Sequence, residues 1–489
     1  MIFLLLSLVL GGSVLRLLYR KWLHPLAHFP GPASAAVSNL PYVKWVISGQ
    51  LHQRLRELHD EYGDVVRIRP NSLVYRSSQA WKDIYGHRKG GALPFIKDPE
   101  FFTPAPPGHA HLINANEADH ARQRRLLSHA FSDRVMRDQE PLIMSHVNTF
   151  IQKLKDKARE GEVIDMTDWL NFLTFDIVGD LAFGEPFGCL KDSAYHPWVG
   201  TIFNSIKTGA ILRAFAVYPH LANSMRHLMP KRLTEKRRAH YQMSKEKMLR
   251  RLSIQTQRPD FVSYILRYNE DDERCMSRSE IEMNAAIIIQ AGSETSASVL
   301  CSCIYLLLQR PECLERAVNE IRSTFIHDSD ITFTASSKLD YVSAVIEESL
   351  RLFPAIPAIL PRLVPDGGAT INGEFVPAHT SVSVAHYSAY RGSENFTDPD
   401  TFAPERWLDS APKEFTPYQS DQHDVFQPFS YGPRGCIGQN LAYAEMRNIL
   451  AKLLWHFDIT QDFVSPQWVN PKSYIVWAKR PLHVRLEER

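Results

Sequence analysis

The sequence predicts a mainly α-helical protein with a small β-rich region, folded as a single large domain. Helical periodicity covers long segments, such as residues 277–309 and the run that begins at Gln439, whereas strand patterns are short. The 489 residues are 44% hydrophobic and 22% charged, which is typical of a globular protein with ample core. Length alone suggests about three domains. However, no Gly/Ser linker, internal repeat or low-complexity tract divides the chain, so we expect one.

Composition excludes several classes of function. The net charge of +2 identifies no partner, and no nucleic-acid-binding motif accompanies the basic residues. The cysteines are scattered and lack CxxC spacing, which argues against a zinc site or a disulfide framework and indicates a reducing compartment. The six cysteines are Cys189, Cys275, Cys301, Cys303, Cys313 and Cys436.

The first 24 residues have the pattern of a membrane anchor. Residues 2–15 are nearly all apolar, and Arg20 and Lys21 follow. The stretch approaches the roughly 20 residues that span a bilayer, and a shallow insertion into one leaflet is the alternative. Because the positive charges lie on its C-terminal side, the body should face the cytosol. Residues 25–35 are proline-rich and predict a stiff hinge, after which residues 36–489 form the folded body.

Segment 119–125 contains the first candidate site residues. His120 and Arg124 lie at positions i and i+4 of a helical pattern, and both can donate hydrogen bonds to a carboxylate from one helix face. A solvated helix face is the alternative, because Arg122 and Arg125 cannot point inward as well.

The longest helical pattern, residues 277–309, begins with a plausible capping box formed by Ser277 and Glu280. Inside it, residues 291–295 read Ala-Gly-Ser-Glu-Thr. Glycine in mid-helix costs about 1 kcal/mol relative to alanine, so a glycine beside a polar Glu-Thr pair in an apolar helix requires a reason. One possible reason is that small residues leave space for a group bound next to the helix. The other is a helix-packing notch with a threonine bonded to its own backbone.

The segment 341–362 predicts a helix followed by a proline-interrupted apolar stretch. Glu348 and Arg351 lie at i and i+3 on one helix face, where an exposed ion pair of little energetic value is the default. A further arginine, Arg406, follows in a Pro-Glu-Arg-Trp run, and Arg362 ends the apolar stretch. Residues 369–376, with a central Asn-Gly, predict a β-hairpin.

Near the C-terminus a lone cysteine is surrounded by glycines. Residues 429–438 read Phe-Ser-Tyr-Gly-Pro-Arg-Gly-Cys-Ile-Gly and precede a long helical pattern. A thiolate that ligates iron needs backbone N–H groups aimed at its sulfur, and Gly432, Gly435 and Gly438 would let the main chain fold around it. The following helix N-terminus favours an anion at Cys436. A buried structural cysteine is the alternative.

The spacing Phe-x-x-Gly-x-Arg-x-Cys-x-Gly resembles the cysteine loop of the haem-thiolate monooxygenases, the cytochrome P-450 family. The resemblance covers essentially the whole chain from Tyr19, with five motifs in the family's order. It implies the family's mostly helical fold, with residues 36–489 as the catalytic domain and haem b bound by the Cys436 thiolate. This chain has Glu294 where Asp is commoner and His120 where Trp is usual. The implied sites are Thr295 and Glu294 for oxygen activation and proton relay; His120, Arg124, Ala291, Gly292, Arg362, Phe429, Arg434 and Gly438 around the haem; and Glu348, Arg351 and Arg406 as a structural lock.

The resemblance also implies insertion of one oxygen atom from dioxygen into a C–H bond. No dinucleotide or flavin module is evident, so electrons should come from a separate NADPH–cytochrome P-450 reductase, with cytochrome b5 as a further donor, at the endoplasmic reticulum membrane. Residues 19–32 are similar to fungal members that modify secondary metabolites such as terpenoids or polyketides.

The segments expected to line the substrate cavity, residues 93–96, 101–102, 287–288 and 355–360, are apolar almost throughout. An ionised ligand buried there would lose several kcal/mol of hydration, so we expect a neutral, lipophilic polycyclic or terpenoid-like substrate whose tilt Ile288 and Ile359 limit. Hydroxylation, desaturation, epoxidation and oxidative ring coupling all stay open. An isomerase or dehydratase acting on a peroxide would not need the Glu-Thr pair. A non-catalytic haem sensor is the alternative from another class.

Overall fold

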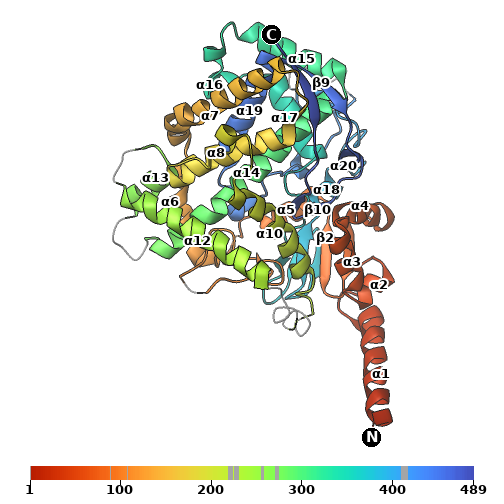
Figure 1. Ribbon diagram of the computed structural model, residues 1–489. Helices are drawn as coiled ribbons and strands as arrows, with labels where there is room; N and C mark the ends of the chain where they lie inside the picture. Colours follow the sequence, from red (N-terminus) through yellow and green to blue (C-terminus); the bar gives the residue numbers. More distant parts are fainter. Residues whose placement is uncertain are drawn as a thin grey trace.

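The computed structural model describes residues 2–88, 90–106, 108–218, 224, 231–254, 258–269, 275–408 and 417–489. Helices dominate this part of the chain, and its short strands form four small sheets (Figure 1), which confirms the mainly helical fold with a small β-rich region. The helices are α1 (Ile2–Leu18), α2 (Ala33–Val37), α3 (Leu40–Ser48), α4 (Leu51–Tyr62), α5 (Ser78–Tyr85), α6 (Glu117–Ser128), α7 (Asp133–Arg159), α8 (Met166–Phe183), α9 (Cys189–Asp192), α10 (Pro197–Ala214), α12 (Lys231–Ser253), α13 (Phe261–Tyr268), α14 (Arg278–Leu308), α15 (Pro311–Thr324), α16 (Phe333–Ser336), α17 (Asp340–Leu352), α18 (His386–Ala389), α19 (Gln439–His456) and α20 (Pro466–Val469).

The largest sheet has five strands in the order β1-β2-β8-β5-β3, with β2 and β8 parallel and the other pairs antiparallel. A three-stranded sheet has the order β4-β12-β9, and two hairpins complete the β-rich region. The strands are β1 (Val65–Arg69), β2 (Ser72–Tyr75), β3 (Ile96–Lys97), β4 (Ile164–Asp165), β5 (Arg362–Leu363), β6 (Ala369–Ile371), β7 (Glu374–Val376), β8 (Ser381–Val384), β9 (Phe457–Phe463), β10 (Ser473–Tyr474), β11 (Val476–Trp477) and β12 (His483–Glu488).

Local sequence signals explain where several elements begin and turn. The predicted capping box is confirmed at the start of α14, where Ser277 Oγ accepts from Glu280 N and the Glu280 carboxylate accepts from Ser277 N. The predicted hairpin is confirmed as β6–β7. Asn372 and Gly373, with φ of 53° and 82°, form its turn, and this is the backbone that an Asn-Gly pair favours.

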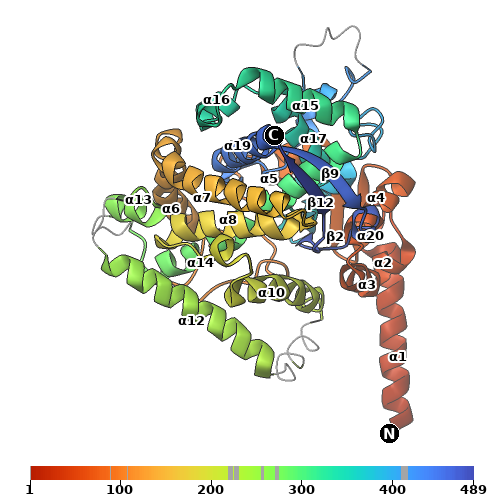
Figure 2. The same cartoon turned by 45° about the horizontal axis from the view of Figure 1, so that its top comes forward.

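Helix α14 passes through the middle of the body and packs along α8, which in turn contacts α7 (Figure 2). These helices, with α17 and α19, form the largest hydrophobic core. Leu300 and Ile304 of α14 are 0% and 2% exposed, and burial of each such side chain contributes about 1.5–3 kcal/mol. The core therefore holds α14 in a fixed position relative to the helices and loops around it.

The N-terminal helix α1 extends away from the body in both views (Figures 1 and 2). It is 17 residues long, and its exposed side chains include Phe3, Leu8 and Leu15. A π-helical segment, residues Tyr19–Leu23, continues it to the proline-rich stretch. Among the described helices, α14 is the one whose length and composition would allow it to cross a membrane, but 67% of its apolar window is buried, so it is a core helix.

The proline-rich stretch is held against the body. Arg67 N of β1 donates to Pro30 O at 2.7 Å, and Arg20 Nη1 donates to Val37 O at 2.7 Å. A Cβ on Gly31 would lie 2.5 Å from Arg67 O, so the contact requires glycine. These contacts place the start of the body directly beside the five-stranded sheet.

Candidate active site

The cysteine loop lies between a 3-10 turn, Gly432–Arg434, and the N-terminus of α19. Gly432 has φ of 71°, and a Cβ there would lie 2.0 Å from Tyr85 O. The loop therefore needs glycine at this position for both its backbone conformation and its close approach to α5. Gly435 and Gly438 have φ of −58° and −91°, so among the three glycines of the loop Gly432 is the one in the left-handed region.

The loop surrounds Cys436 with the groups that a thiolate requires. Cys436 N donates to Phe429 O at 2.8 Å, which closes the loop, and the backbone N–H of Gly438 is directed at the sulfur. Burial raises the pKa of the thiol, while Gly438 and Arg124 lower it. The residue is nevertheless exposed, so the loop leaves it open to a ligand. A metal cation bound at the sulfur would deprotonate the thiol and reverse the effect of burial.

Next to this loop, cationic side chains from four segments converge. Arg124 Nη1 donates to Gly435 O at 2.6 Å, and Arg434 Nη2 donates to Ala115 O at 2.9 Å and to Glu117 at 2.7 Å. Burial and the neighbouring cations together lower the pKa of His120 to about 3 and that of Arg362 to about 10. The cluster consists of Lys97, His120, Arg124, Arg362 and Arg434.

The cluster has the features of a site for a carboxylate-bearing group. Arg362 is 5% exposed, and its Nη1, like Nε and Nη1 of Arg434, is buried without a hydrogen-bond partner among the described residues. Buried donors of this kind are normally paired, so the site lacks acceptors that an anion would supply. The two propionates of a haem satisfy this requirement beside a thiol that can ligate iron. The residues present therefore fit the group.

Sequence reasoning missed Lys97. Its ammonium donates to Ile113 O, and burial followed by Arg362 and Arg434 lowers its pKa to about 6. Lys97 pairs with Arg362 across β3 and β5. A two-residue strand has too short a pattern to be recognised in the sequence, so the pairing that places Lys97 beside Arg362 is evident only in the structure.

In α14, Ala291 is exposed although the helix runs through the core. Gly292 packs on α8, where a Cβ would lie 3.1 Å from Val178 Cγ2. Thr295 Oγ1 donates to Ala291 O at 2.5 Å. The glycine notch against α8 and the threonine bonded to its own helix, which the packing alternative predicts, are thus both present. Neither prevents the small side chain of Ala291 from leaving room beside it, and the Thr295 oxygen can still accept a hydrogen bond.

Glu294 is buried beside this position at 7% exposure. Burial raises the pKa of its carboxyl to about 8, and Lys479 and Arg480 partly oppose the increase. Glu294 Oε2 has no hydrogen-bond partner among the described residues. A carboxyl that titrates near neutral pH can both accept and release a proton, which is the property a relay needs.

Glu348, Arg351 and Arg406 are brought together and fully buried, with side chains 0% exposed. Arg351 donates from Nε and Nη2 to the two Glu348 oxygens, both at 2.8 Å, and Arg406 Nε donates to Oε1 at 3.1 Å. The exposed ion pair that spacing alone suggests is therefore not what the structure contains.

Sequence reasoning missed two further members of this network. Trp407 Nε1 donates to Glu348 Oε2 at 2.9 Å, and Arg406 also pairs with Asp421. Arg351 uses its remaining donors on the carbonyls of Tyr390, Pro399 and Thr401. The side chains join α17 to the segment that leads to the cysteine loop. They lie in a position to support the loop and make no contact with Cys436 itself.

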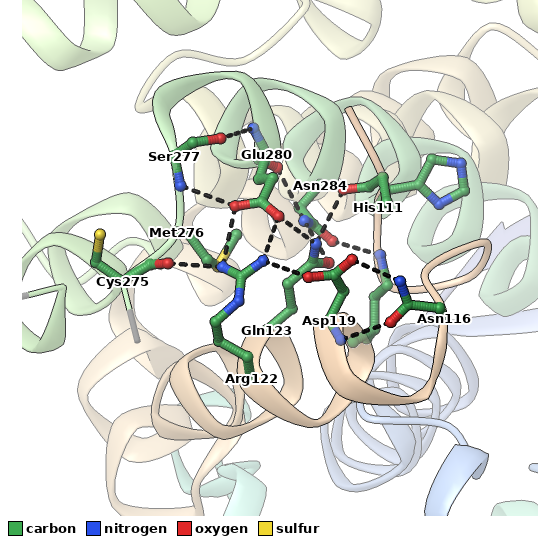
Figure 3. Close-up of polar contacts among 12 residues, drawn as sticks. His111, Asn116, Asp119, Arg122, Gln123, Cys275, Met276, Ser277, Glu280 and Asn284 are labelled. Carbon is green, nitrogen blue, oxygen red and sulfur yellow. Dashed lines mark hydrogen bonds and ion pairs between the residues drawn. The ribbon is translucent and has the colours of Figure 1, made fainter. Parts of the chain in front are cut away.

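The structure also decides between the alternatives for α6. Arg122 does not point to the cationic cluster but forms a bidentate pair with Glu280 of α14, with contacts of 2.5 and 3.0 Å (Figure 3). Gln123 donates to the same carboxylate at 3.1 Å, while Arg125 is exposed. Different faces of α6 therefore contact the cysteine loop, the start of α14 and solvent.

The same network holds the chain segment that precedes α6. Asn284 Oδ1 accepts from Leu112 N at 2.9 Å, and Gln123 Nε2 donates to Ala110 O at 3.0 Å (Figure 3). The helix that carries His120 and Arg124 is thus fixed to the helix that carries Thr295.

The expected substrate-lining segments lie in different places. Phe101 and Ile359 line a cavity of ≈ 50 Å³, whereas Phe95 is buried in the core around the five-stranded sheet and Ile288 packs on the main core. The cavity wall also contains charge, because Arg69 pairs with Glu100 at 2.7 Å. Arg213, whose guanidinium lies 5.4 Å from the ring centre of Phe101, lines the cavity as well. The expectation of an apolar lining is therefore incomplete at this cavity.

Comparison with known proteins identifies the family. The Cytochrome P-450 family model matches residues 30–486. The chain is 61% identical to cytochrome P-450 monooxygenase astJ of Aspergillus oryzae over 476 residues, which are 97% of this chain and 94% of the relative. It is 42% identical to monooxygenase astA of Talaromyces wortmannii, with 99% and 96% of the two chains covered, and 41% identical to averantin hydroxylase of Dothistroma septosporum, with 96% and 88% covered. The chain therefore belongs to the cytochrome P-450 family of haem-thiolate monooxygenases.

Proposed function

We propose that this protein is a membrane-anchored monooxygenase of fungal secondary metabolism that inserts one oxygen atom from dioxygen into a neutral lipophilic substrate. The observation that carries the proposal is the position of Cys436 in its loop, near buried guanidinium donors of Arg362 and Arg434 that have no hydrogen-bond partner among the described residues. The matches to fungal monooxygenases over almost the full chain support the biological setting. The printed name of averantin hydroxylase favours hydroxylation among the reactions that share this chemistry.

Haem supplies reductive activation of dioxygen when bound, and the protein residues hold and tune it. We assign the thiolate ligand to Cys436, with Phe429 and Gly438 shaping its loop. Arg124, Arg362, Arg434 and His120 would bind the propionates, and Lys97 lies where it can add a further donor. The small side chain of Ala291 would leave room for the haem and its ligand, while Gly292 lets α14 pack closely on α8. Glu294 and Thr295 would move protons to the reacting oxygen.

Replacing Thr295 with Ala should lower the amount of product formed per NADPH by roughly an order of magnitude, because proton delivery would become disordered. Haem content should stay nearly the same, since Thr295 bonds only within its own helix in this structure. The measurement compares NADPH consumption, hydrogen peroxide and product in the reconstituted enzyme. Thr295→Ser keeps the hydroxyl and serves as the matched control. An unchanged product-to-NADPH ratio in Thr295→Ala would contradict the role.

The substrate class can be tested directly by spectral titration of the haem enzyme with neutral and ionised analogues of matched size. We expect the neutral analogue to bind more tightly, by at least about tenfold, because an ionised group loses hydration without gaining a partner. Arg69 is already paired with Glu100 and Asp98, so it does not offer a vacant charge. Tighter binding of the ionised analogue would disprove this substrate class. In a separate experiment, the metabolite that accumulates when the gene is deleted would identify the substrate.

We place the protein at the endoplasmic reticulum membrane, with a single N-terminal anchor, a cytosolic body and electrons from NADPH–cytochrome P-450 reductase, assisted by cytochrome b5. The exposed apolar side chains of α1 support an anchor. A haem sensor would not oxidise NADPH when reductase is added, so NADPH consumption coupled to product separates these two classes of function.

Deleting residues 1–24 should move the protein from the membrane pellet towards the soluble fraction and leave its haem spectrum intact. The reason is that, among the described residues, none from α1 belongs to a hydrophobic core. Fractionation and the reduced carbon monoxide spectrum measure both properties. Loss of the haem signal would show that this segment belongs to the folded body.

A further inference from the structure

The C-terminal segment between β11 and β12 brings two consecutive cations, Lys479 and Arg480, to the face of α14 that carries Glu294. Arg480 Nη2 lies 3.3 Å from both Ser298 Oγ and Ser302 Oγ. These serines follow Glu294 by four and eight residues, so Arg480 lies along the same side of the helix. Neither cation contacts Cys436 or the cationic cluster near it in the described contacts.

Arg480 is held rigidly although no carboxylate pairs with it among the described residues. It is 4% exposed, and its guanidinium lies 4.1 Å from the ring centre of Trp468, 4.7 Å from Phe353 and 5.1 Å from Trp477. Its carbonyl accepts from Thr167 Oγ1 at 2.7 Å. Cation–π contacts stabilise a buried guanidinium, but they do not neutralise its charge.

Lys479 lies at the surface end of the same group. Its ammonium contacts Asp168 Oδ1 at 3.1 Å and the Tyr195 hydroxyl, and Tyr195 donates to the same carboxylate at 2.7 Å. The Lys479 and Asp168 side chains are 36% and 40% exposed. Asp168 and Tyr195 thus orient Lys479 between solvent and the interior of the protein.

Both Glu294 and Arg480 have buried polar atoms without a partner among the described residues, Oε2 and Nη1 respectively. The cations that act on Glu294 are Lys479 and Arg480 of the C-terminal segment. Two titratable groups come from other positions: Tyr195 of the segment before α10, which donates to Asp168 of α8, and Cys301 further along α14. Burial and, to a smaller extent, the Glu294 charge raise the pKa of both groups. Lys479 has the larger effect of the two cations, and both favour the carboxylate form of Glu294 against its burial.

We propose that Lys479 and Arg480, which the C-terminal segment brings to the Glu294 side of α14, are positioning residues whose charges favour release of the proton from the Glu294 carboxyl. The relay role of Glu294 rests on the proposed function. The effect of the two cations on the protonation of Glu294, which we call the charge relation, does not. Without these cations, burial alone would act on the carboxyl and keep it protonated over a wider pH range, so that it could no longer pass protons on.

Infrared difference spectra of the haem-loaded full-length protein measure the charge relation, and Glu294→Gln identifies the carboxyl band. We expect Lys479→Met to move the titration midpoint of Glu294 upward by about one pH unit, because a nearby positive charge is lost. Arg480→Met should move it in the same direction and Arg480→Lys should restore it. Arg485→Met is the matched control, since Arg485 lies in the next element, β12, and pairs with Asp462 at 2.9 Å.

An unchanged midpoint in Lys479→Met, or an equal shift in Arg485→Met, would overturn the inference. Lys479 is near the surface, so its substitution decides the question even where Arg480→Met does not fold. In turnover assays with reductase, the pH at which product per NADPH is half-maximal should shift with the infrared midpoint. Since the infrared titration needs no turnover, a protein that forms no product but shows the shift would count against the proposed function and not against the charge relation.

Discussion

Replacement of Cys436 with Ser will abolish the thiolate-specific carbon monoxide difference band and all product formation. A serine hydroxyl cannot supply the electron donation of a thiolate to iron. In the structure, Cys436 receives the Gly438 N–H and lies near Arg124, and both interactions favour the anionic sulfur. No other cysteine in the described residues lies in this loop, so no neighbour can replace it. The measurements are the reduced carbon monoxide spectrum, haem content and turnover with reductase.

Cys275→Ser is the control for this substitution. Cys275 is partly exposed, and its interaction with Arg122 uses the backbone carbonyl, which serine retains. The control should keep both the spectrum and the activity. Retention of the thiolate band in Cys436→Ser would contradict the ligand assignment, whereas loss of the band in both variants would point to general misfolding.

Glu348→Gln should produce the second large effect, a loss of about 3–5 kcal/mol in the free energy of unfolding. The substitution leaves Arg351 buried without the charge that compensates it, and it leaves Arg406 with Asp421 in place of two carboxylates. It also weakens the contacts of the carboxylate with Ala403 N and Trp407 Nε1, at 2.9 Å each. Because this network supports the segment before the cysteine loop, haem retention should fall as well. Urea unfolding and haem content measure the two effects.

The exposed pair Arg54–Glu57 provides a matched comparison, since it has the same i, i+3 spacing and a contact of 2.6 Å. Glu57→Gln should change the free energy of unfolding by no more than about 1 kcal/mol, because solvent screens this pair. If the two substitutions had similar effects, burial would not be what makes the Glu348 network important.

Much of the site could be predicted from short patterns, because helix capping, tight turns and i, i+3 or i, i+4 spacing depend on residues close in the chain. The capping box at Ser277, the hairpin turn at Asn372 and the face shared by His120 and Arg124 follow from such rules. The glycine-rich loop around Cys436 was evident for the same reason. The match of this loop to the family's pattern indicated that the cofactor is haem.

Tertiary structure decided what these local patterns could not. It determines that Gly432 must be glycine, because Tyr85 O lies where a Cβ would be, and that Arg122 pairs with Glu280 instead of facing solvent. It also places Arg480 beside Ser298 and Ser302, on the side of α14 that carries Glu294. Each relation joins residues that are far apart in the chain, and packing fixes their distance and dielectric environment. The sequence by itself determined the helices, the turn and the reactive cysteine, whereas burial and long-range contacts decided which charges are paired, which are left to bind a cofactor, and which carboxyl can exchange protons.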